Sequence, residues 1–175
     1  PLPKLIRRYH DRALILCTNR CFIHCRFCFR KRFWISESAD WNITKGEFAK
    51  IAEYISSESA IREVILSGGD PLCLNDKEFF YMIGNLDRIR NVDVIRIASR
   101  ALSAKPDMIN AKFVRNLTKL SRKIWFMSHF NHPAELSDDA KIAISKGPEC
   151  PLIGGAKLAE LNIHPICDPF SSITI

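Results

Sequence analysis

Apolar runs alternate with amphipathic segments along most of the 175-residue chain. Short runs rich in Val, Ile and Leu predict buried strands, and apolar residues that recur every three to four positions predict helices. Strands are expected at 13–18, 63–67, 92–98, 124–128 and 163–167. Helices are expected at 45–57, 76–90, 110–121, 137–144 and 155–161, with Thr44 as the N-cap of the first.

This alternation predicts an α/β fold with a parallel sheet. Because the strands are nearly continuous apolar runs, we expect both faces of the sheet to be covered. Residues 1–175 are interpreted as one domain, with a basic N-terminal arm at 1–12 and a separate C-terminal segment at 145–175.

Composition narrows the class of protein. Hydrophobic residues make up 47% of the chain and charged residues 26%, as in ordinary globular domains. No apolar run is long enough for a membrane helix, and no signal peptide opens the sequence. Because the sequence starts at Pro1 and not at Met, a targeting segment before it stays open. Seven cysteines, three of them close together, favour a reducing compartment, so the cytoplasm is expected.

The net charge of +7 raises the question of nucleic acid binding. The basic residues are concentrated at 4–12 and 26–32, on either side of a group of cysteines. An enzyme that handles anionic cofactors would need them there. Elsewhere lysines alternate with acids, as on solvated helix faces, so neither nucleic acid nor a membrane is expected as a partner.

The cysteine group is Cys21, Cys25 and Cys28 in the run CFIHCRFC. Three thiolates this close together can bind three irons of a [4Fe–4S] cluster, which leaves the fourth iron open to a small molecule. Zinc remains an alternative, but it needs four ligands, and no second pair follows at zinc-finger distance. Arg26 and Arg30 argue against a simple buried helix. The other cysteines, at 17, 73, 150 and 167, are interpreted as core or incidental.

Three further polar motifs follow predicted strands. Gly68–Gly69–Asp70 follows the strand at 63–67, Ser99–Arg100 follows the third strand, and SHFNHP follows the fourth. In a βα barrel the carboxyl ends of the strands form the active site. We therefore expect these motifs and the cysteine run to lie together.

These motifs resemble those of a known family. CFIHCRFCFR resembles the cluster loop of the radical S-adenosylmethionine (SAM) enzymes. RRYHDRALILCTNRC, SGGDPL, VIRIASR and SHFNHP are similar, in this order, to motifs of the lysine 2,3-aminomutase family, over residues from about Leu2 to Ile144. The segment CRFCFRKRF also resembles the branch that acts on lysine for attachment to elongation factor P. The resemblance implies a partial (βα) barrel, here with about five strands.

The resemblance also implies cofactors and roles. The cluster would bind SAM and, with an electron from a flavodoxin- or ferredoxin-type donor, cleave it to a 5'-deoxyadenosyl radical. Pyridoxal phosphate (PLP) would then assist a 1,2-amino migration on lysine or a related small amino acid, and a homo-oligomer is compatible with the resemblance. SAM would be bound by Gly68, Gly69, Asp70, Ser99, Arg100, His129 and Asn131. Tyr9 and Arg12 would bind the PLP phosphate, and Arg26 and Arg30 the substrate carboxylate. No catalytic residue is assigned.

The resemblance weakens near the C-terminus. The family carries its Schiff-base lysine in a later Gly-rich loop, so Lys157 is interpreted as part of a loop entering a helix. Cys167–Asp168 fall where the family has Asn-Gln, which marks 145–175 as divergent or missing its continuation. Two alternatives stay open: a truncated cluster- and SAM-binding domain that completes no rearrangement, and a zinc-binding interaction module.

Overall fold

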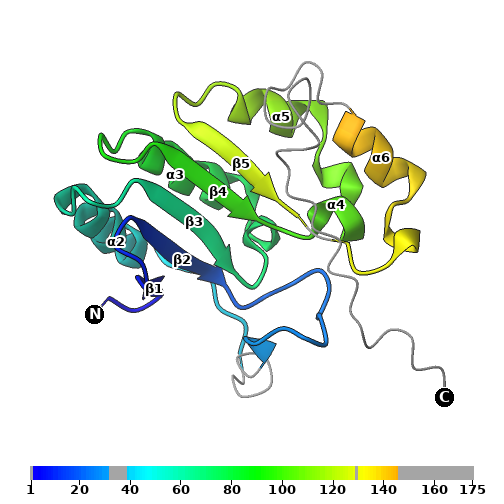
Figure 1. The fold of residues 1–175 in the computed structure, drawn as a ribbon, viewed down its shortest axis with the longest axis horizontal. Helices are drawn as coiled ribbons and strands as arrows, with labels where there is room; N and C mark the ends of the chain where they lie inside the picture. Colours follow the sequence, from blue (N-terminus) through cyan, green and yellow to red (C-terminus); the bar gives the residue numbers. More distant parts are fainter. Residues whose placement is uncertain (1, 32–38, 129, 146–175) are drawn as a thin grey trace.

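The computed structural model describes residues 2–31, 39–128 and 130–145. Its centre is a five-stranded sheet with the order β1-β2-β3-β4-β5 (Figure 1). The strands are β1 (Leu5–Ile6), β2 (Arg12–Thr18), β3 (Glu63–Gly68), β4 (Val94–Ala98) and β5 (Lys123–Met127). Strands β2 to β5 are parallel, and β1 pairs with β2 in the antiparallel sense. The sheet is open, which confirms the partial barrel.

Helices connect the strands. They are α2 (Lys45–Ser57), α3 (Asp76–Asp87), α4 (Ala101–Ala104), α5 (Ala111–Leu117) and α6 (Asp138–Ser145), with short 3-10 turns η1 (Pro71–Cys73), η2 (Pro106–Met108) and η3 (Pro133–Glu135). Thr44 caps α2 in a capping box with Glu47, as its N-cap position predicts. The helices expected at 76–90 and 110–121 form but end earlier.

Four of the five predicted strands are confirmed to within two residues at each end. β1 was not predicted, because two residues carry no periodicity. The helix expected at 155–161 and the strand expected at 163–167 lie outside the described residues. The count of five strands is therefore reached with β1 at the edge of the sheet.

Burial alternates along each parallel strand. One set of side chains, which includes Ile15, Leu66 and Ile97, is fully buried. Figure 1 shows α2 and α3 behind the sheet, and the side toward the viewer carries no described helix. The prediction that both faces are covered is therefore wrong for the described residues. An open barrel leaves its inner face uncovered.

The inner face carries polar and aromatic side chains that a fully covered sheet would exclude. Arg96 on β4 donates to the Glu63 carboxylate on β3 at 2.8 Å. Its guanidinium also lies 4.8 Å from the ring centroid of Trp125 on β5, and 40% of Trp125 is exposed. This face therefore offers both charge and aromatic surface to a bound molecule.

The opposite face packs on the helices. α2 buries Phe48, Ile51 and Ile55, and α3 buries Phe79, Met82, Ile83 and Leu86. Phe79 stacks on Phe113 of α5 with ring centroids 5.8 Å apart. Burial of each such side chain stabilises the fold by about 1.5–3 kcal/mol, so this layer holds the strands and their ends in place. None of the described helices combines the length and apolar character that crossing a bilayer requires.

Candidate functional site

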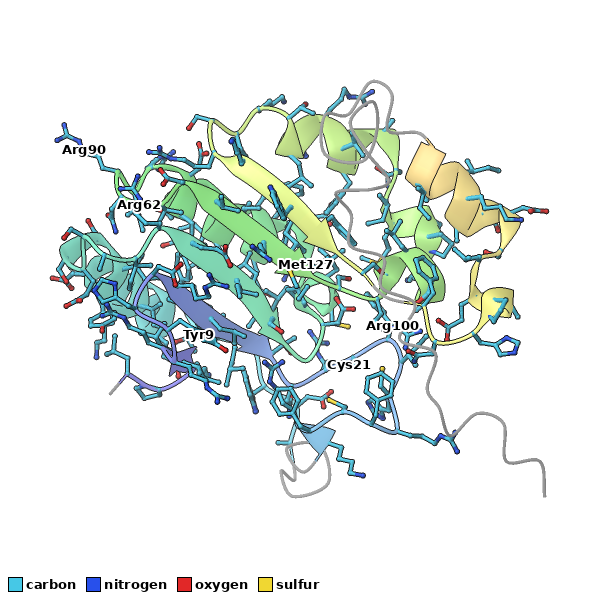
Figure 2. All side chains as sticks on the ribbon, in the orientation of Figure 1. Tyr9, Cys21, Arg62, Arg90, Arg100 and Met127 are labelled. Carbon is cyan, nitrogen blue, oxygen red and sulfur yellow. The ribbon has the colours of Figure 1, made fainter. Side chains whose placement is uncertain are left out.

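The parallel strands bring the four sequence motifs to one edge of the sheet. The cysteine run follows β2, the glycine pair closes β3, Ser99–Arg100 follows β4, and SHFNHP follows β5. In Figure 2 the labels of Cys21 and Arg100 lie beyond the arrowheads of the strands. The expectation that these motifs lie together is confirmed for their described residues.

Two glycines join the end of β3 to the start of the cysteine run. The Gly69 N–H donates to the Thr18 carbonyl, and the Asp70 N–H donates to the Arg20 carbonyl, each at 2.6 Å. A Cβ on Gly69 would lie 2.1 Å from the Arg20 carbonyl oxygen. Gly68 has a φ angle of +115°, a backbone conformation that residues with a side chain rarely adopt. Only glycine allows this close approach.

Asp70 connects this junction to the end of β4. Its buried carboxylate accepts N–H bonds from Leu72 at 3.0 Å and from Arg100 at 2.8 Å. Burial raises the pKa of Asp70, although these bonds, a bond with the Ser99 side chain and the Arg100 charge oppose the increase. The Asp70 side chain is thus engaged within the protein.

Arg100 connects its own motif with the cysteine run and, through Glu135, with SHFNHP. One terminal nitrogen, Nη1, donates to Cys25 Sγ at 3.1 Å, and the other, Nη2, donates to Glu135 Oε2. The same Glu135 oxygen accepts the Asn131 N–H at 2.8 Å. Glu135 was not predicted, because nothing in the sequence connects it with an arginine 35 positions earlier.

The three cysteines are partly exposed and form no disulfide. Burial raises the pKa of Cys21 to about 12, and the charges of Asp70, Cys73, Cys28 and Cys25 add to this shift. A metal therefore has to displace a proton from this thiol. Cys73, which the sequence suggests is core or incidental, is half-buried and lies close enough to Cys21 for its charge to raise the pKa of that thiol.

The donor set fits an iron–sulfur cluster in its chemistry: three thiols from one loop, with a guanidinium donating to one of them. The side chains are not gathered around a common centre. Within 2–31, 39–128 and 130–145, no group of three His, Cys, Asp or Glu side chains is placed to hold a metal ion. Cluster binding therefore requires some of these thiol side chains to change rotamer.

Arg30 reaches from the cysteine run to the end of β3. Its Nη1 donates to Ser67 Oγ at 3.0 Å and to the Gly68 carbonyl at 3.1 Å. Burial lowers its pKa, and its Nε is buried without a hydrogen-bond partner among the described residues. Arg26 is exposed, whereas Arg30 is partly buried.

Tyr9 and Arg12 lie at the other end of the sheet. Arg12 begins β2 and the cysteine run follows its last residue, so the strand separates the two by roughly 20 Å. Tyr9 is 58% exposed, and the Arg12 guanidinium lies 5.3 Å from its ring centroid. Arg12 also pairs with Asp11 at 3.0 Å. The two residues meet each other but not the cysteines.

The remaining predicted residues differ in placement. Ser99 is buried, and its hydroxyl accepts the Ala101 N–H at 3.0 Å. Asn131 contributes its backbone N–H to Glu135. His129 lies outside the described residues, as does Lys157.

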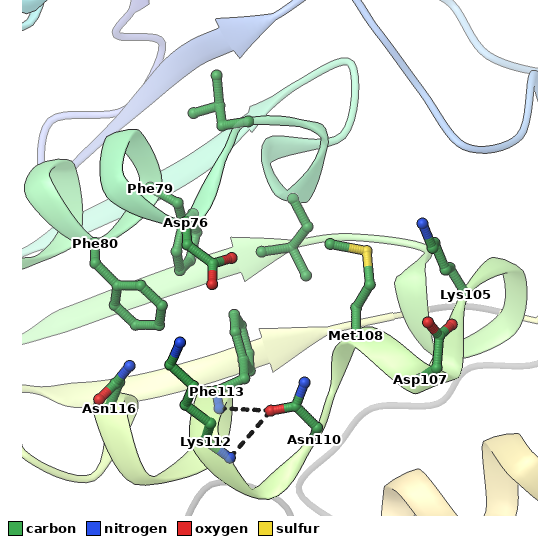
Figure 3. Close-up of a pocket in the computed structure, with 12 residues that line it drawn as sticks. Asp76, Phe79, Phe80, Lys105, Asp107, Met108, Asn110, Lys112, Phe113 and Asn116 are labelled. Carbon is green, nitrogen blue, oxygen red and sulfur yellow. Dashed lines mark hydrogen bonds between the residues drawn. The ribbon is translucent and has the colours of Figure 1, made fainter.

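A pocket of about 260 Å³ lies elsewhere, lined by residues of η1, α3, η2 and α5 (Figure 3). Phe79, Phe80 and Phe113 form its apolar part, and the Asn110 side chain caps α5 at its border. None of the predicted cluster-, cofactor- or substrate-binding residues lines this pocket. It is a gap between outer helices, apart from the four motifs.

Comparison with known proteins identifies the family. The sequence profile described as the radical SAM superfamily matches residues 15–155, which include the cysteine run and the three later motifs. The chain belongs to the radical SAM superfamily. This confirms the resemblance read from the cysteine run, and the open sheet agrees with a partial barrel of this superfamily.

Within the radical SAM superfamily, the chain is similar to lysine 2,3-aminomutases. It is 38% identical over 143 residues to L-lysine 2,3-aminomutase of Acetoanaerobium sticklandii, a match that covers 82% of this chain and 34% of that protein. It is 40% identical over 143 residues to the Fusobacterium nucleatum L-lysine 2,3-aminomutase, covering 82% and 33%. The chain therefore spans about a third of the length of these relatives.

Proposed function

We propose that this chain is a radical SAM aminomutase, which cleaves SAM at a [4Fe–4S] cluster to drive a PLP-assisted 1,2-amino migration on lysine or a related amino acid. The observation that supports this most is the convergence on Arg100, which contacts Cys25 of the cysteine run, Asp70 after β3 and Glu135 in the loop after β5. A site that only stabilised the fold would not need three free thiols in a partly exposed loop.

Three of the four motifs have a role in this proposal. Cys21, Cys25 and Cys28 hold the [4Fe–4S] cluster, which when bound supplies the electron that cleaves SAM. The Gly68–Gly69 backbone lets SAM approach closely, because no Cβ stands in the way. Arg100 has N–H groups to spare for the SAM carboxylate, since a guanidinium has five and three are engaged.

The substrate side uses the inner face of the sheet. Arg30 extends to Ser67, which lies on this face, and its remaining N–H groups suit the α-carboxylate of an amino acid. Tyr9 and Arg12, at the far end, offer a phenol and a guanidinium, which are suitable donors for the phosphate of PLP. The uncovered face between these ends is where substrate and PLP would lie.

SAM cleavage tests the proposal. We expect the anaerobically reconstituted chain, given SAM and dithionite, to produce 5'-deoxyadenosine, and the Cys28→Ala variant to produce none. A cluster-loaded protein that forms no 5'-deoxyadenosine would refute the proposed function. Zinc without iron in anaerobically purified protein would instead favour the zinc-binding module.

A second candidate is a domain that binds cluster and SAM but completes no rearrangement. It is favoured by the coverage of the relatives, of which this chain matches about a third. Adding PLP and L-lysine to the reconstituted chain separates the two candidates. Formation of β-lysine rules out the incomplete domain, whereas 5'-deoxyadenosine without β-lysine favours it.

A further inference from the structure

The contact between Arg100 and Cys25 joins two residues 75 positions apart. A guanidinium N–H points at the sulfur of Cys25 at 3.1 Å. Arg100 is only 8% exposed, so water competes little for this bond. A cationic donor strengthens a hydrogen bond, and it does so most when the acceptor carries negative charge, as a thiolate does.

Arg100 is held in this position from several sides. Its backbone N–H donates to Asp70, and its Nε donates to Ser103 Oγ at 3.3 Å. The far end of the guanidinium is held by Glu135, whose carboxylate is itself fixed by the Asn131 N–H at 2.8 Å. Glu135 therefore anchors the guanidinium to the loop after β5.

We propose that Arg100 donates a hydrogen bond to the Cys25 ligand of the cluster and thereby raises the cluster's reduction potential, and that Glu135 is the positioning residue that keeps it there. This inference rests on the proposed function, since it requires the cluster. Hydrogen bonds to ligand sulfurs and nearby positive charge are among the factors that set iron–sulfur potentials. The reduced cluster carries one more negative charge, so the cation stabilises that state more.

The test is the midpoint potential of the reconstituted chain, followed by EPR during a redox titration without SAM. We expect Arg100→Gln and Arg100→Lys both to shift the midpoint to more negative values. Lys keeps the positive charge, but its single ammonium cannot reproduce the fork with which the guanidinium contacts Cys25, Ser103 and Glu135 through three different nitrogens. A wild-type midpoint in Arg100→Lys would overturn the role of the guanidinium at Cys25, and it would do so even if Arg100→Gln fails to fold.

A double-mutant cycle tests Glu135. Loss of a nearby carboxylate should by itself raise the midpoint, because it removes a negative charge, and Asp138→Ala serves as a control for such a loss on an exposed side chain. In the Arg100→Gln and Arg100→Lys backgrounds, Glu135→Ala should raise the midpoint through the loss of charge alone. If Glu135 acts through Arg100, the same mutation in the presence of Arg100 should raise the midpoint less, or lower it. Equal shifts in these backgrounds would overturn the positioning role.

The outcomes also separate this inference from the proposed function. If the wild-type chain takes up no iron, both fail. If it forms a cluster and cleaves SAM while the Arg100 variants keep the wild-type midpoint, only this inference fails.

Discussion

Gly69→Ala tests how the cysteine run is joined to the sheet. The new Cβ would lie 2.1 Å from the Arg20 carbonyl oxygen and 2.7 Å from its carbon, both backbone atoms that cannot rotate away. To reach a tolerable separation the loop has to move by about 1 Å. The mutation therefore separates the end of β3 from the start of the cysteine run.

The expected cost follows from what this movement breaks. Overpacking of this kind costs about 1–3 kcal/mol. The N–H bonds of Gly69 and Asp70, both 2.6 Å long, weaken as the loop moves, and each is worth about 0.5–1.5 kcal/mol. We expect Gly69→Ala to lower the free energy of unfolding by about 2–6 kcal/mol, a large part of the roughly 5–15 kcal/mol that holds a typical domain folded.

Urea denaturation followed by far-UV circular dichroism measures this change. Gly84→Ala is the matched control, because a Cβ at this position within α3 meets nothing within 4 Å. Alanine is favoured over glycine in a helix by about 1 kcal/mol, so the control should be slightly stabilised. If Gly69→Ala unfolds at the wild-type urea concentration, or if both variants lose equal stability, the reasoning is refuted.

Two further predictions concern the scaffold. Asn91→Ala should lower the free energy of unfolding by about 2–3 kcal/mol, because the Asn91 amide donates to the carbonyls of Ile55, Glu58 and Ile61. The control Asn85→Ala loses one exposed bond, so its free energy of unfolding, measured in the same way, should change little. The bond from Lys4 and the Thr44 N–H lower the pKa of Glu47 from 4.5 to about 2, so its stabilising contribution is present above pH 4.5 and is lost as the pH falls toward 2. Unfolding measured across this range should show a smaller loss of stability in Glu47→Gln, and identical pH profiles would contradict the assignment.

Local and topological features of this chain could be predicted from its sequence. Thr44 and Glu47 lie three residues apart, so their capping box depends on nothing distant. The meeting of the four motifs follows from parallel strands, which place their carboxyl ends at one edge. Neither prediction needed knowledge of side-chain contacts.

Features that depend on distant partners could not be predicted. Glu135 binds Arg100, and Cys73 lies close enough to Cys21 to raise its pKa. The periodicity of a sequence does not indicate such pairs. Sequence alone does not reveal that no described helix covers the inner face, because Leu14, Leu16 and Ile65 resemble core residues although they are only partly buried. β1 was missed because its pairing with β2, rather than its own sequence, makes it a strand.

We propose that three sulfurs of the cysteine run hold a [4Fe–4S] cluster whose fourth iron is free for SAM. EPR spectroscopy of the reduced, reconstituted chain, with and without SAM, is the decisive test. We expect about four irons per chain, a [4Fe–4S] signal that SAM alters, loss of this signal in Cys21→Ala, Cys25→Ala and Cys28→Ala, and its retention in Cys73→Ala. A signal that SAM leaves unchanged, or one that disappears in Cys73→Ala, would show that the fourth iron is already occupied by the protein.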